Sequence, residues 1–93
     1  MAHCPYEKLA DLEPVLDAVR QWVAIKEKKP GIFYFKALPF LHFHEKDGER
    51  WADVRDGKTW GEPVAISFQS TKTARGTFQK EVRRRYEALA KPK

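Results

Sequence analysis

The sequence contains very little of what identifies many proteins from composition alone. It holds one cysteine, Cys4, so no disulfide can form within the chain, and few cysteines are typical of proteins from reducing compartments. No apolar run approaches the roughly 18 residues that a membrane helix needs. The first residues, MAHCPYEKLADLE, lack the basic start and apolar block of a secretory signal. These features predict a cytoplasmic protein that does not enter the membrane.

Motifs for catalysis and cofactor binding are lacking too. No serine, cysteine or pair of carboxylates stands in a pattern typical of catalysis, so an enzyme is the less favoured class and no cofactor is predicted. Residues 70–77, STKTARGT, lack the glycine and lysine spacing of a phosphate-binding loop. His3 and Cys4 adjoin each other near the start of the sequence, where chains commonly fray, and we expect no fixed site there.

Composition nevertheless indicates a folded domain. The hydrophobic fraction of 42% is too high for a disordered chain, and 93 residues predict a single α+β domain over residues 1–93 with a modest core. The net charge of +5 is unevenly distributed, because residues 70–93 carry eight basic and two acidic residues. Such a basic segment suits a nucleic acid or an acidic partner, although a solvated helix face is the commoner explanation.

The N-terminal third has the apolar spacing of an amphipathic helix. We expect it to begin near Asp11 as N-cap, because Pro14 is tolerated only in the first turn of a helix, and to end at Pro30-Gly31. A separate short turn of helix over residues 6–10 is expected before it. The apolar residues on one face are Leu9, Leu12, Leu16, Val19 and Val23.

Residues 33–54 form the clearest local pattern. Asp47-Gly48 is typical of a two-residue type I′ turn, which fixes the register between strands at residues 40–45 and 49–55. His42 then faces Asp53, and His44 faces Trp51. Since alternate residues share a face, the core side receives Leu41, Phe43, Ala52 and Val54. The outer side receives Phe40, His42, His44, Trp51, Asp53 and Arg55.

The remaining elements complete a two-layer prediction. A three-residue loop at 37–39 would place Phe33 and Phe35 of a strand at 32–36 in the core, and a short fourth strand is expected at 64–67. A second helix over residues 70–90 would begin at Ser70 or Thr71, or later at Thr77, with its buried residues at Phe78, Val82, Tyr86 and Leu89. The sequence thus predicts an α+β sandwich: an antiparallel sheet of three or four strands with both helices on one face.

The outer face of this sheet is the first candidate site. Aromatic and basic side chains on an open sheet are typical of protein interfaces and of surfaces that stack nucleic-acid bases. We favour self-association as a homodimer, or binding of another protein, with an ordinary solvated surface as the plain alternative. Nucleic-acid binding, aided by the basic C-terminal helix, is less favoured. The predicted surface comprises Tyr34, Lys36, Phe40, His42, His44, Trp51, Asp53 and Arg55.

Two smaller sites are alternatives. His42, His44 and Asp53 project from one face and suit a divalent metal such as zinc, although a His42–Asp53 ion pair that raises the pKa of His42 explains the same residues. Near the start of the second helix, free backbone N–H groups favour an anion. The predicted anion-binding residues are Lys72, Thr73, Arg75 and Thr77.

Overall fold

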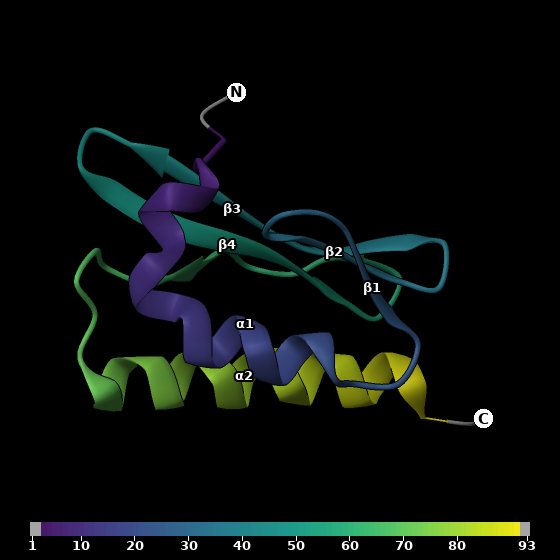
Figure 1. The fold of residues 1–93 in the computed structure, drawn as a ribbon. Helices are drawn as coiled ribbons and strands as arrows, with labels where there is room; N and C mark the ends of the chain where they lie inside the picture. Colours follow the sequence, from purple (N-terminus) through teal and green to yellow (C-terminus); the bar gives the residue numbers. More distant parts are fainter. Residues whose placement is uncertain (1–2, 92–93) are drawn as a thin grey trace.

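An antiparallel sheet with both α-helices on the same side makes up the molecule (Figure 1). The structure is a computed structural model that describes residues 3–91. Its elements are η1 (Tyr6–Leu12), α1 (Glu13–Arg20), β1 (Ile25–Lys29), β2 (Ile32–Phe35), β3 (Leu38–Lys46), β4 (Glu49–Asp56), β5 (Thr59–Trp60), β6 (Val64–Ala65) and α2 (Lys72–Ala90). The predicted α+β class and helix placement are confirmed, with a somewhat larger sheet than expected.

The sheet has six strands in the order β1-β2-β3-β4-β5, and β6 also pairs with β4. Both short strands lie along the same edge of β4: Trp60 is opposite Arg55, and Ala65 is opposite Trp51. The strand expected at residues 64–67 is therefore present as the shorter β6, and β5 is a strand that the sequence did not predict.

The β3–β4 hairpin has the predicted register throughout. Lys46 pairs with Glu49, His44 with Trp51 and His42 with Asp53. The turn residues Asp47 and Gly48 have φ values of 54° and 81°, as a type I′ turn requires. The four side chains predicted for the core side are all buried: Leu41, Phe43, Ala52 and Val54.

The expected N-terminal helix is too long. Helix α1 ends at Arg20, Ala24 has a positive φ of 71°, and Ile25–Lys29 form the edge strand β1. Val23, expected on the buried stripe, is 80% exposed. The Lys-rich segment suits an exposed sheet edge, where charges discourage pairing with other chains. Pro30-Gly31 consequently turns the chain between β1 and β2 instead of ending a helix.

The connection between β2 and β3 also differs from the prediction. Phe35 pairs directly with Leu38, so the turn is Lys36-Ala37, and the register then shifts between Phe33 and Tyr34. This irregularity turns Phe40 into the core, where its ring lies 6.4 Å from that of Tyr86. Phe40 is thus not part of the outer surface, because a β-bulge lets two successive residues face the same side.

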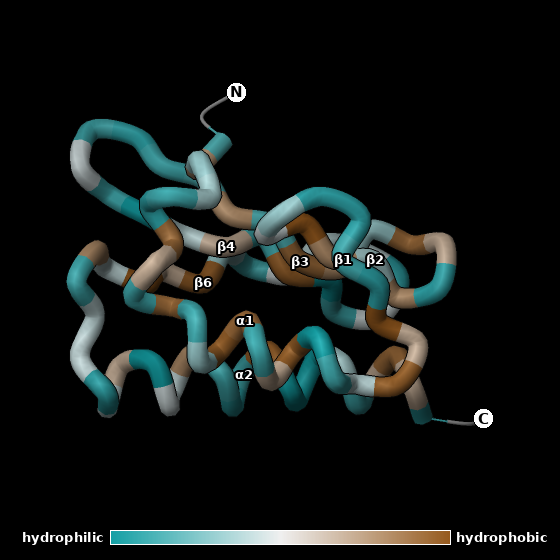
Figure 2. The backbone as a smooth tube through the Cα atoms, in the orientation of Figure 1, coloured by the Kyte–Doolittle hydropathy of each residue, from teal (hydrophilic) through white to brown (hydrophobic). Residues whose placement is uncertain are grey.

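Helix α2 begins at the earlier of the predicted positions. The Thr71 hydroxyl accepts a hydrogen bond from the Ala74 N–H at 3.0 Å, which caps the helix. The predicted stripe of Phe78, Val82 and Tyr86 is buried, with Leu89 partly buried. Figure 2 shows hydrophobic segments along α1, α2 and the central strands, where the layers meet. No helix among residues 3–91 has the length and apolar character needed to cross a bilayer.

A buried arginine joins the N-terminal segment to the sheet. The Arg50 guanidinium donates from Nη1 and Nη2 to the two carboxylate oxygens of Asp11, both at 2.8 Å, and its Nε donates to the Ile66 carbonyl at 2.9 Å. Its other N–H groups reach the carbonyls of Lys8 and Ser67. Asp11 is therefore not the N-cap of α1, which has no side-chain cap. Bonds from Arg50 hold the pKa of the Asp11 carboxyl well below its usual range.

Candidate metal centre

Three imidazoles gather at the outer side of the β3–β4 hairpin, and they are all the histidines that the chain contains. The rings of His42 and His44 have centroids 4.6 Å apart, and that of His3 lies 5.6 Å from His44 and 6.0 Å from His42. One nitrogen from each ring can be chosen so that all three atoms lie within 4.8 Å of one another. This cluster offers three potential ligands for a single ion.

The backbone explains why these side chains meet. His42 and His44 are alternate residues of β3 and so project from the same face. His3 forms an isolated antiparallel bridge with His44, and the N–H of the next residue, Cys4, donates to the Phe43 carbonyl at 3.1 Å. From the sequence we expected no fixed site near the start of the chain; these backbone contacts nevertheless hold His3 against β3.

Asp53 completes the cluster from β4. Its Oδ2 lies 3.8 Å from Nε2 of His42 and 2.9 Å from Nε2 of His44. This 2.9 Å separation would be an ion pair if His44 were protonated, but the contact does not meet the geometry of a hydrogen bond. His44 Nε2 is therefore the one buried side-chain nitrogen or oxygen within residues 3–91 that lacks a hydrogen-bond partner. Donor atoms of a tetrahedral zinc site are separated by about 3.4 Å, given metal–ligand distances near 2.1 Å. The imidazole nitrogens, which are up to 4.8 Å apart, would therefore have to move closer together to bind an ion.

The environment lowers the pKa of His42. Burial is the main cause, and the neighbouring His44 acts in the same direction, while Asp53 opposes both. The predicted elevation of the His42 pKa is thus wrong, because burial outweighs the opposing effect of Asp53, which lies 3.8 Å away. A lowered pKa favours the neutral imidazole, which is the form that coordinates metals.

Two tryptophans flank the imidazoles. The Trp51 ring stacks on His44 with centroids 5.6 Å apart, and the Trp60 ring lies 5.0 Å from His42. The Arg55 guanidinium lies over the Trp60 ring, 4.9 Å from its centroid. Trp60 was not anticipated from the sequence, although the turn signal at Asp56-Gly57 returns the chain beside Arg55 and could have indicated it.

The remaining predicted surface residues are not part of the cluster. Tyr34 is half-buried on β2, with the Lys28 ammonium 4.7 Å from its ring centroid. Lys36 is exposed in the β2–β3 turn. Arg55 is half-buried, and its Nε donates to the Pro39 carbonyl at 2.7 Å. The eight residues predicted for one surface thus lie in different places. His42, His44 and Asp53 belong to the imidazole cluster, Trp51 borders it, and Phe40 is in the core.

The predicted anion-binding residues lie in the first turns of α2. Lys72, Thr73 and Thr77 are exposed there. Arg75 instead donates to the Ser70 carbonyl oxygen. Ser70 is in turn held by Asp11, which accepts from its N–H at 2.9 Å and from its hydroxyl at 2.6 Å. Arg75 therefore contributes to the capping loop, and nothing in this group of contacts resembles a built anion site.

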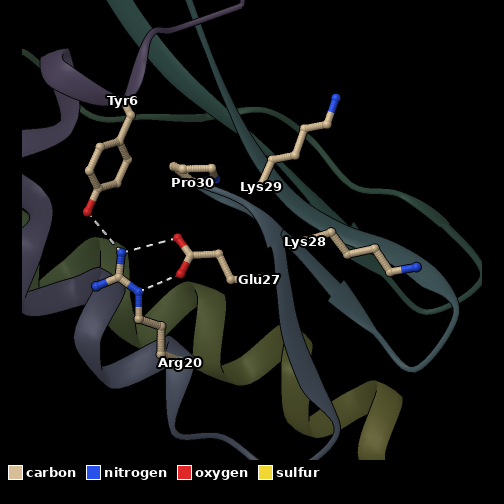
Figure 3. A pocket seen from close by; sticks show the side chains of 6 residues that line it. All are labelled: Tyr6, Arg20, Glu27, Lys28, Lys29 and Pro30. Carbon is tan, nitrogen blue, oxygen red and sulfur yellow. Dashed lines mark hydrogen bonds and ion pairs between the residues drawn. The ribbon is translucent and has the colours of Figure 1, made fainter.

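A separate hollow of about 320 Å³ lies between η1, α1 and β1 (Figure 3). Glu27 accepts two hydrogen bonds from Arg20, at 2.7 and 3.1 Å, and the Tyr6 hydroxyl accepts a third from Arg20 at 3.0 Å. Figure 3 shows the ammonium groups of Lys28 and Lys29 directed away from these bonds. The hydrogen bonds between Arg20 and Glu27 join α1 to β1. Because the two charged groups already bind each other, this hollow is a weaker candidate for a ligand site than the imidazole cluster.

The fold and the cluster together define a small α+β domain with a candidate site for a metal ion on its helix-free sheet face. Comparison with known proteins found no family model, no curated protein and no solved structure that matches this chain.

Proposed function

We propose that this domain binds one divalent transition-metal ion through His3, His42 and His44, with Asp53 as the fourth ligand. The observation that carries the proposal is the buried Nε2 of His44, which has no hydrogen-bond partner and faces a carboxylate oxygen at 2.9 Å. An unpaired buried nitrogen is costly. A metal ion would use its lone pair and would also explain why two further imidazoles meet it there.

The donor set favours particular metals. Imidazole nitrogen with one carboxylate oxygen suits zinc, and also cobalt, nickel or copper, whereas calcium and magnesium require mostly oxygen donors. The only thiol does not contribute to this set, because Cys4 is buried among core residues and burial raises its pKa. Zinc is the metal we expect to be bound, and Co²⁺ is a spectroscopic substitute for it.

Equilibrium dialysis of the untagged protein against Zn²⁺, followed by elemental analysis, tests the proposal. We expect one ion per chain, and we expect His42→Ala to weaken binding by about 100-fold, since even an outer-shell change can cost that much. Asp53→Asn should weaken it less. Glu49→Gln removes an exposed carboxylate from the same strand and should leave binding unchanged. Absence of binding at micromolar zinc, or equal affinity in all variants, would contradict the proposal.

A second candidate is association with a protein through the face around the cluster, most simply a second copy of this chain. It is supported by a large apolar side chain beside His42 on this face, Trp60, which is 41% exposed. Light scattering over a range of concentrations tests it, with Trp60→Ser as the variant that should weaken association. A monomer at the highest concentration, with and without zinc, would argue against the self-association form.

A further inference from the structure

The attachment of the N-terminal segment to the sheet differs markedly between its two ends. Its later part is held by the buried side chains of Leu9 and Leu12 and by the bonds from Arg50 to Asp11 and to the Lys8 carbonyl. Its first described residues have fewer contacts: one small buried side chain, that of Cys4, and two backbone contacts. One backbone hydrogen bond joins Cys4 to Phe43, and the bridge between His3 and His44 adds to it.

His3 and Cys4 are adjacent, but they occupy opposite environments. The His3 side chain is exposed and lies over the imidazoles of β3, whereas Cys4 is 5% exposed and belongs to the core cluster. In an extended segment, successive side chains point in opposite directions. A movement that lifts residues 3–5 off the sheet and exposes the Cys4 thiol therefore also carries His3 away from His42 and His44.

We infer that metal binding fastens residues 3–5 to the sheet, so that occupancy of the site controls whether the Cys4 thiol is exposed. The inference rests on the proposed metal site and adds its regulation. An ion coordinated by His3 and the two β3 imidazoles connects positions about 40 residues apart in the sequence. Since the opened segment offers no third imidazole, the ion binds the closed form more tightly and shifts the population toward it.

The rate at which Cys4 reacts with iodoacetamide, followed by mass spectrometry, measures this opening because the chain has no other cysteine. Saturating Co²⁺ should slow labelling of the intact protein by about tenfold or more, as expected when a ligand prefers the closed state by that factor. The Cys4 amide, which donates to the Phe43 carbonyl, should exchange its hydrogen more slowly by a similar factor. An unchanged labelling rate in protein shown to hold the ion would overturn the inference.

Two variants separate a fastening role from general stabilisation. His3→Ala changes an exposed side chain, so the fold should persist and the ion should still bind at higher concentration, but the protection of Cys4 should disappear. Lys8→Ala removes the ion pair with Glu45 and should speed labelling without abolishing the effect of Co²⁺. Full protection in His3→Ala at saturating Co²⁺ would overturn the inference.

The outcomes also distinguish this inference from the metal site itself. Dialysis that detects no bound ion overturns both. A bound ion with unprotected Cys4 overturns only the fastening role. A thiolate-to-cobalt charge-transfer band in the electronic spectrum would mean that Cys4 itself coordinates the ion, and this would likewise overturn the inference, because protection would then need no closed segment.

Discussion

Arg50 and His44 lie on the same hairpin and are almost fully buried, at 2% and 4% exposure, yet their polar atoms are in opposite situations. Each of the five N–H groups of Arg50 has an oxygen acceptor. The Nε2 of His44 has none, although a carboxylate oxygen is close to it. A satisfied buried group is explained by the fold alone. An unsatisfied one, beside two more imidazoles, is the observation from which we propose a metal site.

The largest effect should come from removing the satisfied group. Arg50→Met leaves three carbonyls without their donor and the Asp11 carboxylate with only its bonds from Ser70. Breaking a buried ion pair costs about 3–5 kcal/mol of the free energy of unfolding. Urea denaturation monitored by tryptophan fluorescence measures this loss. Arg84→Met is the control: it removes exposed ion pairs with Glu81 and Asp56 and should have little effect, because exposed ion pairs contribute little to stability. A similar stability for both variants would show that the Arg50 bonds contribute little.

Metal should produce the next largest effect. Free Zn²⁺ at 100 times its dissociation constant should raise the free energy of unfolding by about 2.7 kcal/mol if the unfolded chain does not bind it. Urea denaturation with and without Zn²⁺ measures the increment. His42→Ala should lose most of it, whereas Glu49→Gln should retain all of it. An equal increment in both variants would place the ion elsewhere.

Sequence reasoning could bring together only part of this cluster. The Asp47-Gly48 turn and the period-two alternation were sufficient to place His42 opposite Asp53 and on the same face as His44. These are local relations, set by one hairpin. His3 is 41 residues from His44, and its position depends on how the N-terminal segment docks, for which the sequence carries no local signal.

The errors in the fold have a similar origin. Residues 25–29 lie next to a strongly helical apolar pattern, and only their pairing with β2 makes them a strand. The sequence between β2 and Phe40 is compatible with several loop lengths. In the structure, the chain forms a tight turn followed by a bulge, which allows both Phe40 and Leu41 to be buried. Tertiary packing decided both cases.

Replacing the unsatisfied group should have a smaller effect, and in the opposite direction. His44→Phe substitutes a ring of similar shape and removes a buried nitrogen without a partner, so the metal-free protein should keep its stability or gain about 1 kcal/mol. Zinc should no longer stabilise this variant. Urea denaturation in the presence of a chelator gives the first value. A large loss of metal-free stability would show that His44 already has a structural partner.

Acid should affect the Arg50 region by a modest amount. Hydrogen bonds from Arg50 and Ser70 lower the pKa of Asp11 in the folded state, so the unfolded state binds the proton more readily. The stability that this difference provides is complete well above the unfolded value of about 3.9 and is lost as pH falls through the lower folded pKa. Asp11→Asn should therefore flatten the decline in stability below about pH 4. An unchanged acid profile in this variant would contradict the assignment.

The central claim is that three imidazoles from two distant segments bind one ion. Long-range ¹⁵N NMR resolves it directly, because the chain has only three histidines and each contributes one imidazole to the cluster. During titration with Zn²⁺, we predict that the ring nitrogen signals of His3, His42 and His44 all change together and stop changing at one equivalent. Unchanged signals after one equivalent, or changes confined to His3, would contradict the account.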